Sequence, residues 1–228
     1  MRIDRLISNL PRYNRQTARY LLSSGRVRVN GILVNDACLD VRVFDSVQID
    51  DEVIQAGLPA RYLMLHKPAG YVSATEHPQH PTVLDLIGEP GSALHLAGRL
   101  DLNTTGLLLL TNDGQWSRRL TSPSRRHAKV YLVETENPID PKCIDAFAQG
   151  LYFAYEGITT LPAELDILEP RLARLTLQEG RYHQVKRMFG HFRNRVTCLH
   201  REAIGPLTVS ELAPGMFRSL TAAEIATF

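Results

Sequence analysis

The chain of 228 residues lacks several features that mark specialised classes of protein. Its three cysteines, Cys38, Cys143 and Cys198, are far apart and odd in number, so the sequence predicts neither a disulfide framework nor a zinc cluster. No apolar run approaches the ~20 residues that span a bilayer, and the first residues are charged where a signal peptide would be apolar. We therefore expect a cytoplasmic protein that makes no contact with a membrane.

Sequence signatures of cofactors and metals are missing too. The chain has no glycine-rich phosphate-binding loop and no dinucleotide fingerprint. His77 and His80 come nearest to metal-ligand spacing, but the adjacent prolines disfavour a helix and no further ligands cluster nearby. We therefore expect chemistry that uses side chains alone, with no cofactor and no metal.

What is present is an ordinary globular composition with an uneven distribution of charge. Hydrophobic residues make up 44% and charged residues 22%, enough for a real core. Residues 1–31 hold seven arginines against one aspartate, a charge of +6, whereas residues 32–57 hold six acids against one arginine, a charge of −5. Two more basic stretches lie at 115–131 and 181–201. Basic clusters separated from acidic ones are typical of phosphate-binding surfaces.

The N-terminal segment has the pattern of two helices and a hairpin. Apolar residues at helical spacing predict a helix within residues 3–10 and a second helix from the N-cap Asn14 to Gly25. Asn30-Gly31 then supplies the two positive-φ residues of a tight hairpin. This leaves three arginines on the solvent side of the helices: Arg12, Arg15 and Arg19.

This order of elements resembles the αL RNA-binding module, which is named after a small-subunit ribosomal protein. The resemblance covers about 50 residues and implies an RNA-binding domain over residues 1–57. The alternative is a small helical domain whose arginines form a solvated face. Glycine and proline at 55–59 indicate a linker before a second domain, residues 61–228.

The second domain is rich in predicted strands, with helices placed between them. Alternating or apolar patterns predict strands at 62–66, 107–110, 129–135, 172–177, 195–200 and 207–209. Helices are expected from Asp140-Pro141 to Gly150 and, with a capping box of Thr221 and Glu224, at the C-terminal end. Because strands and helices do not alternate regularly, we expect an α+β fold with a mainly antiparallel mixed sheet.

The most informative stretch runs from Gly98 to Gly114 and reads GRLDLNTTGLLLLTNDG. It places Asp101 in a polar turn directly ahead of an apolar strand, which would hold the backbone rigidly and leave the carboxylate free. The alternative is that Asp101 only caps the turn, as aspartates often do. The stretch resembles the signature motif of the pseudouridine synthases, and the whole chain, in order, is similar to the ribosomal small subunit pseudouridine synthase A family.

The resemblance implies roles for further residues. Asp101 would be the catalytic carboxylate, and Lys129-Val130-Tyr131 resembles the motif that supplies an active-site tyrosine, Tyr131. The stretch 179–189 resembles a third motif, in which Lys186 takes the position of the cation beside the carboxylate. Related synthases carry arginine there. Leu199 would pack near the target base, and Lys67-Pro68-Ala69-Gly70 resembles the Lys-Pro-x-Gly motif, which is otherwise typical of a type II turn.

The family implies isomerisation of one uridine in 16S ribosomal RNA, uridine 516, free or within a partly assembled small subunit. An aspartate is ionised at neutral pH, so it can act as nucleophile or base, and the sequence leaves open whether it attacks the sugar or the base or removes a sugar proton. We expect a monomer. The candidate RNA contacts are Arg99, Arg181, His183, Gln184, Arg12, Arg15, Arg19, Arg118, Arg119, Arg125 and Arg126. Two other hypotheses are a non-catalytic RNA-binding or ribosome-assembly protein and an aspartate-nucleophile hydrolase of a small molecule.

Overall fold

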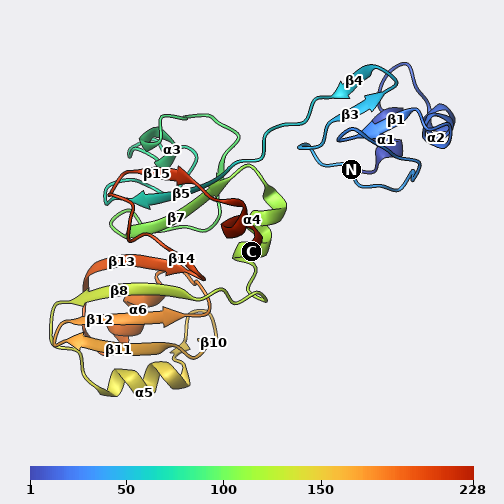
Figure 1. Cartoon of the computed structure of the whole chain (residues 1–228). Helices are drawn as coiled ribbons and strands as arrows, with labels where there is room; N and C mark the ends of the chain where they lie inside the picture. The colour runs from blue at the N-terminus through green and yellow to red at the C-terminus, as the bar shows by residue number, and fades with distance from the viewer. The chain divides into compact units, whose positions relative to one another are not determined.

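A computed structural model describes residues 1–228 and divides them into two compact units, Met1–Ala60 and Arg61–Phe228 (Figure 1). Each unit has a core of its own. No helix in either unit combines the length and the apolar composition that a membrane span requires.

The N-terminal unit packs two helices against a small antiparallel sheet, with strand order β2-β1-β3-β4. Asn14 is the N-cap of the second helix, as predicted, because its side chain accepts a hydrogen bond from the Thr17 N–H. The hairpin at Asn30 and Gly31 is also confirmed, with φ of 50° and 80°. The elements are α1 (Ile3–Ser8), α2 (Arg15–Ser23), β1 (Val27–Val29), β2 (Ile32–Leu33), β3 (Val47–Ile49) and β4 (Glu52–Gln55).

The second unit is built on a nine-stranded sheet with the path β11-β12-β8-β13-β7-β5-β15, to which β14 adds beside β13 and β6 beside β7. All strand pairs are antiparallel except β13 with β7, which confirms the mainly antiparallel α+β prediction. The strands are β5 (Tyr62–Lys67), β6 (His95–Leu96), β7 (Thr105–Thr111), β8 (Lys129–Thr135), β11 (Glu164–Glu169), β12 (Leu172–Leu177), β13 (Val196–Ile204), β14 (Leu207–Thr208) and β15 (Phe217–Ser219). A separate hairpin pairs β9 (Tyr152–Phe153) with β10 (Ile158–Thr159).

Apolar side chains cover the central strand β7 on both faces. Because side chains alternate along a strand, Leu108 and Leu110 join one core cluster and Leu107 and Leu109 join another. Helices cover these clusters: α5 and α6 contribute to the first, whereas Trp116 of α4 contributes to the second. The helices of this unit are α3 (Val83–Leu86), α4 (Gly114–Thr121), α5 (Lys142–Gln149), α6 (Gln184–His191) and α7 (Ala222–Ala226).

The boundaries of several elements differ from prediction. Helix α5 begins at Lys142 with Pro141 as its cap residue, although the Asp140 side chain does accept a hydrogen bond from the Lys142 N–H. The capping box of Thr221 and Glu224 on α7 is present as predicted. The structure adds α3, α4 and strand β11, for which the sequence pattern gave no prediction.

Candidate functional site

The signature stretch forms a loop, residues 98–104, whose backbone is held from inside the protein. The Lys67 side chain is completely buried at the end of β5, and its Nζ donates hydrogen bonds to the carbonyls of Asp101 (3.2 Å), Leu102 (3.1 Å) and Thr104 (2.8 Å). It also donates to the Pro68 carbonyl at 3.0 Å. Because these carbonyls turn inward toward the ammonium, the Asp101 carboxylate is left to point outward.

Two more buried side chains hold the same loop, Ser73 and Arg201. The Ser73 hydroxyl donates to the Leu100 carbonyl at 2.7 Å and accepts from the Leu100 N–H at 3.1 Å. Arg201 of β13 is 3% exposed, and it donates from Nε to the Leu107 carbonyl at 2.8 Å and from Nη1 to the Arg99 carbonyl at 3.4 Å. Buried donors thus bind the loop from its first residues to the start of β7.

A glycine of the signature stretch makes the close approach of β13 possible. Gly106 pairs with Arg201 in the parallel ladder and has φ of +107°. A Cβ at this position would lie 2.2 Å from the Arg201 carbonyl oxygen, closer than any tolerated contact. Only glycine satisfies both the backbone conformation and the spacing.

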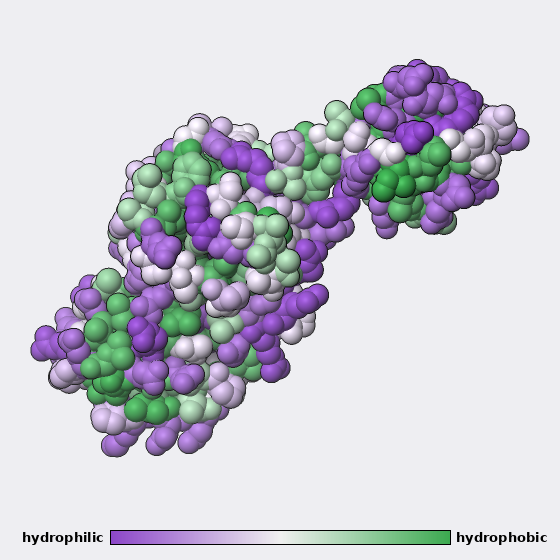
Figure 2. All heavy atoms as spheres, in the orientation of Figure 1, coloured by the Kyte–Doolittle hydropathy of each residue, from purple (hydrophilic) through white to green (hydrophobic).

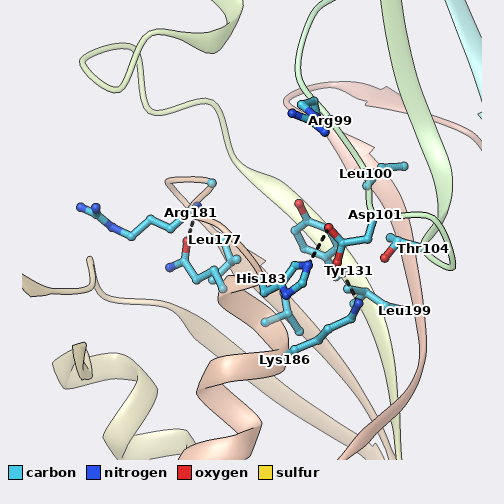
Figure 3. A pocket seen from close by; sticks show the side chains of 13 residues that line it. Arg99, Leu100, Asp101, Thr104, Tyr131, Leu177, Arg181, His183, Lys186 and Leu199 are labelled. Carbon is cyan, nitrogen blue, oxygen red and sulfur yellow. Dashed lines mark hydrogen bonds and ion pairs between the residues drawn. The ribbon is translucent and has the colours of Figure 1, made fainter. Parts of the chain in front are cut away.

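The Asp101 carboxylate lies between two basic side chains of the α6 region (Figure 3). Lys186 Nζ is 2.8 Å from Oδ2, and His183 Nε2 is 3.4 Å from Oδ1. His183 is the residue before α6 and adopts a left-handed backbone, with φ of 48°, which is uncommon for a residue other than glycine. The carboxylate itself is about one third exposed.

Tyr131 completes the site from strand β8. Its ring is 7% exposed, and its hydroxyl lies 3.5 Å from Arg201 Nη1. Asp101, Tyr131 and Lys186 together line a pocket of about 70 Å³, and Leu199 lies in its wall (Figure 3). The predicted residues Arg99, Arg181, His183 and Gln184 line it too. Four segments that are far apart in sequence therefore meet here: the loop, β8, α6 and β13.

Some predicted RNA contacts turn out to be occupied within the protein. Gln184 is 3% exposed, and its amide accepts from the Arg181 N–H and donates to Glu179 Oε1, so it organises the turn before α6 and is not free to bind RNA. Arg181 is half-exposed and forms ion pairs with Glu179 at 2.8 Å and Glu156 at 3.7 Å. Arg187 also pairs with Glu156, at 2.5 Å.

The predicted basic surfaces differ in how free their arginines are. In the N-terminal unit, Arg12 pairs with Glu52, so the basic and acidic segments that are separate in sequence partly neutralise one another in space. Arg15 and Arg19 are exposed and have no ion-pair partner. On α4 and the segment after it, where Figure 2 shows a hydrophilic surface, three arginines are exposed and have no acidic partner: Arg118, Arg125 and Arg126. Arg119 instead donates to the Phe228 carbonyl.

Burial changes the pKa of several groups near the loop. It lowers the pKa of Lys67 to about 8, against the opposing effect of the Asp101 charge. It also lowers the pKa of Lys129, which borders Tyr131, with a further contribution from the positive charge of Arg201. His200 shares a hydrogen bond with the Thr105 hydroxyl. Its pKa is also lowered, mainly by burial and to a smaller extent by the charge of His66. No group of three or more potential metal ligands gathers anywhere in the structure.

Comparison with known proteins identifies the family to which the chain belongs. The family model for RNA pseudouridylate synthases matches residues 61–191. The chain is 59% identical over 227 residues to the ribosomal small subunit pseudouridine synthase A of Pseudomonas aeruginosa, covering 99% of both chains. The chain belongs to the ribosomal small subunit pseudouridine synthase A family. The synthase is also 44% identical to the Escherichia coli protein of the same name over 229 residues, covering 100% of this chain and 99% of the relative.

A solved structure titled as a crystal structure of pseudouridylate synthase has the same fold as this synthase. It superposes with a TM-score of 0.71 at 38% sequence identity, covering 99% of this chain and 98% of that one. The synthase is therefore an RNA pseudouridine synthase, an isomerase.

Sequence reasoning missed the residues that hold the loop. Lys67 stands in a stretch that resembles the Lys-Pro-x-Gly motif, but no role was predicted for Lys67, Ser73 or Arg201. A lysine in an otherwise apolar strand, followed by a turn, was the one available signal for Lys67.

Proposed function

We propose that this synthase converts one uridine of 16S ribosomal RNA to pseudouridine, using Asp101 as its catalytic carboxylate and no cofactor. The observation that carries the proposal is the Asp101–Lys186 contact of 2.8 Å inside a pocket that Tyr131 and Leu199 also line. The relatives are named for the small ribosomal subunit, which supports its RNA as the substrate. The family expectation for the target is uridine 516, in free RNA or a partly assembled subunit in the cytoplasm.

The reaction needs no external group. The C1′–N1 bond of uridine breaks, a C1′–C5 bond forms, the proton on C5 leaves and N1 gains a proton. Because the substrate and product are isomers, no electrons or groups are exchanged with a cofactor. A rigid carboxylate, a cation and a cavity that retains the detached uracil are chemically sufficient.

Each residue of the pocket has a distinct part in this proposal. Asp101 acts as nucleophile or base, with Lys186 donating to Oδ2 and His183 lying 3.4 Å from Oδ1. The Tyr131 ring stacks on the uracil near C5, and Leu199 packs against the base. The inward hydrogen bonds of Lys67 and Arg201 keep Asp101 oriented before substrate binds.

RNA binding must bring a stacked uridine into the pocket, which costs ~a few kcal/mol of unstacking. Phosphate contacts from the unpaired arginines on and after α4 and from Arg15 and Arg19 would offset this cost. We assign the N-terminal unit to RNA binding on this basis. The synthase would act as a monomer, since one unit supplies every residue of the pocket.

The test follows the proton that leaves C5. Small-subunit RNA labelled with tritium at uracil C5 is incubated with the wild type, with Asp101→Asn and with the control Asp145→Asn, whose aspartate is exposed on α5. We expect tritium release from the wild type and the control, and none from Asp101→Asn. Release that persists without the carboxylate would refute the role of Asp101.

The same assay separates the two other hypotheses. A protein that only binds RNA would hold the substrate and release no tritium on either free RNA or small-subunit particles. A hydrolase would liberate free uracil and leave an abasic position, which chromatography of the reaction detects. Sequencing that maps pseudouridine in the RNA of cells without this protein identifies the target uridine.

A further inference from the structure

The pocket around Asp101 opens into a second, larger cavity. Its volume is about 700 Å³, within the range of cavities that enclose ligands much larger than one uracil. Asp101 and Tyr131 line both spaces, so the two are continuous. The larger cavity extends to Arg126, on the segment after α4, and to Tyr182, before α6. The mechanism proposed above gives Tyr182 no role and uses Arg126 only as one of several arginines that contact phosphate.

Tyr182 is an aromatic ring left open to solvent at this place. It is 76% exposed, and its ring stacks on that of His183, with centroids 3.9 Å apart and planes inclined by 17°. The His183 ring is in turn 3.4 Å from Asp101. The left-handed backbone at His183 is strained for a side chain, and such strain tends to persist where function requires it. One face of the Tyr182 ring is therefore supported by the site, and the other is free.

The larger cavity also has an excess of positive charge. Of the two acids in its wall, Asp101 is paired with Lys186, and Glu179 is engaged by Arg181 and Gln184. The cations in the same wall that have no acidic partner are Arg99, Arg126, Lys129 and Arg201. Arg201 Nη2 is buried without an acceptor, which is costly for a guanidinium in the free protein. An anionic ligand in the cavity would balance this excess of positive charge.

These observations fit a second nucleotide. We propose that Tyr182, supported by His183, is a stacking platform for one unpaired base that lies next to the target uridine in the RNA, and that Arg126 binds a nearby phosphate. Two short contacts separate the Tyr182 ring from the catalytic carboxylate, so the ring lies within reach of a nucleotide adjacent to the one bound at Asp101. The inference rests on the proposed function, because it takes single-stranded RNA as the ligand.

Tyr155 provides a matched control. It is 98% exposed, more than Tyr182, but it lines neither of the two cavities and stacks on no other ring. Both tyrosines can be replaced without disturbing a core. Tyr182→Phe retains a stacking face, whereas Tyr182→Ala removes it.

The experiment compares RNA fragments that contain the target uridine and carry an abasic residue at one flanking position at a time. On intact RNA we expect Tyr182→Ala to lower kcat/KM by about ten- to a hundredfold, the usual effect of losing one base–aromatic stack. Tyr182→Phe and Tyr155→Ala should match the wild type. An abasic residue at one flanking position should lower kcat/KM of the wild type by a similar factor. The same residue should leave kcat/KM of Tyr182→Ala unchanged. Equal activity of Tyr182→Ala and wild type, or losses that multiply at every abasic position, would overturn the platform.

A binding measurement keeps this inference separate from the proposed reaction. With 2-aminopurine at the flanking position, stacking on Tyr182 should quench its fluorescence when the wild type or Asp101→Asn binds, and Tyr182→Ala should bind without quenching. Quenching without turnover would refute the proposed reaction but support the platform. Turnover by the wild type with identical fluorescence for Tyr182→Ala would refute the platform alone.

Discussion

Replacing Lys67 by methionine tests whether burial disfavours the charged ammonium that donates to the loop of residues 98–104. Burial lowers the pKa of Lys67 from 10.5 to about 8. This difference corresponds to about 3.4 kcal/mol by which the folded protein disfavours the charged form. Methionine fills a similar volume without a charge, so the stability of the variant does not depend on protonation at position 67.

The sign of the pH effect follows from proton binding. Below pH 8 Lys67 is charged in both the folded and the unfolded state, and the cost is fully present. Between about 8 and 10.5 the unfolded chain binds more protons than the folded protein, so the wild type gains stability as the pH rises. From pH 7 to pH 9 the gain is about 1.3 kcal/mol in the free energy of unfolding. The difference between wild type and Lys67→Met should rise by this amount.

Urea unfolding followed by circular dichroism at pH 7, 8 and 9 measures this difference. Lys142→Met is the matched control, because Lys142 is exposed at the start of α5, and its difference from the wild type should stay constant with pH. A Lys67→Met difference that stays flat or falls over the same range would refute the reasoning, since it would mean that burial does not disfavour the charge.

Three further predictions concern stability and RNA binding. Gly106→Ala should destabilise the protein by about 3 kcal/mol or more in a urea titration, because the new Cβ would collide with the backbone of β13, whereas Gly190→Ala, with open space on α6, should be neutral or slightly stabilising. Asp113→Ala should lower the free energy of unfolding by about 1–2 kcal/mol in the same titration, because the carboxylate caps two N–H groups of α4. Asp113→Asn should retain most of this capping stabilisation. A double substitution of Arg15 and Arg19 by glutamine should raise KM for RNA without changing kcat, with a weaker dependence of KM on salt; an unchanged KM would argue against RNA binding by α2.

Site residues that each stand within a continuous sequence motif could be predicted from sequence. Asp101, Tyr131 and Lys186 each stand in a recognisable stretch, and the structure brings all three to one pocket. Apolar alternation predicted strands such as 129–135 and 172–177 with the bounds that the structure has. These signals are local, so tertiary context did not need to be known.

Other features depend on contacts between distant residues, and no local pattern reveals them. The Lys67 hydrogen bond to Thr104 spans 37 positions, and that of Arg201 to Arg99 spans 102. Strand β11 has charged residues on its exposed side and lies at the sheet edge, so its apolar signal is weak. Helix α4 begins at Asp113-Gly114, a pair that by itself indicates a turn.

The number of arginines in the N-terminal sequence also exceeds the number that remain unpaired in the structure. The contrast between residues 1–31 and 32–57 indicated a phosphate-binding surface separate from the acidic residues, but Arg12 pairs with Glu52 and Arg26 with Asp50. Folding brings the two segments together, because the acidic residues lie on and beside β4 and β3. The arginines that remain available are therefore fewer than the sequence count.

The two buried cations of the loop indicate what the protein gains from placing charge inside its core. Neither Lys67 nor Arg201 has a carboxylate partner there, so burying each charge costs free energy. Both instead bind backbone carbonyls of residues 99–107. These hydrogen bonds fix the backbone that carries Asp101, and Lys186 and His183 contact its carboxylate from the other side. The cost of burying two cations is therefore offset by a rigid loop backbone, which sets the position of the Asp101 carboxylate.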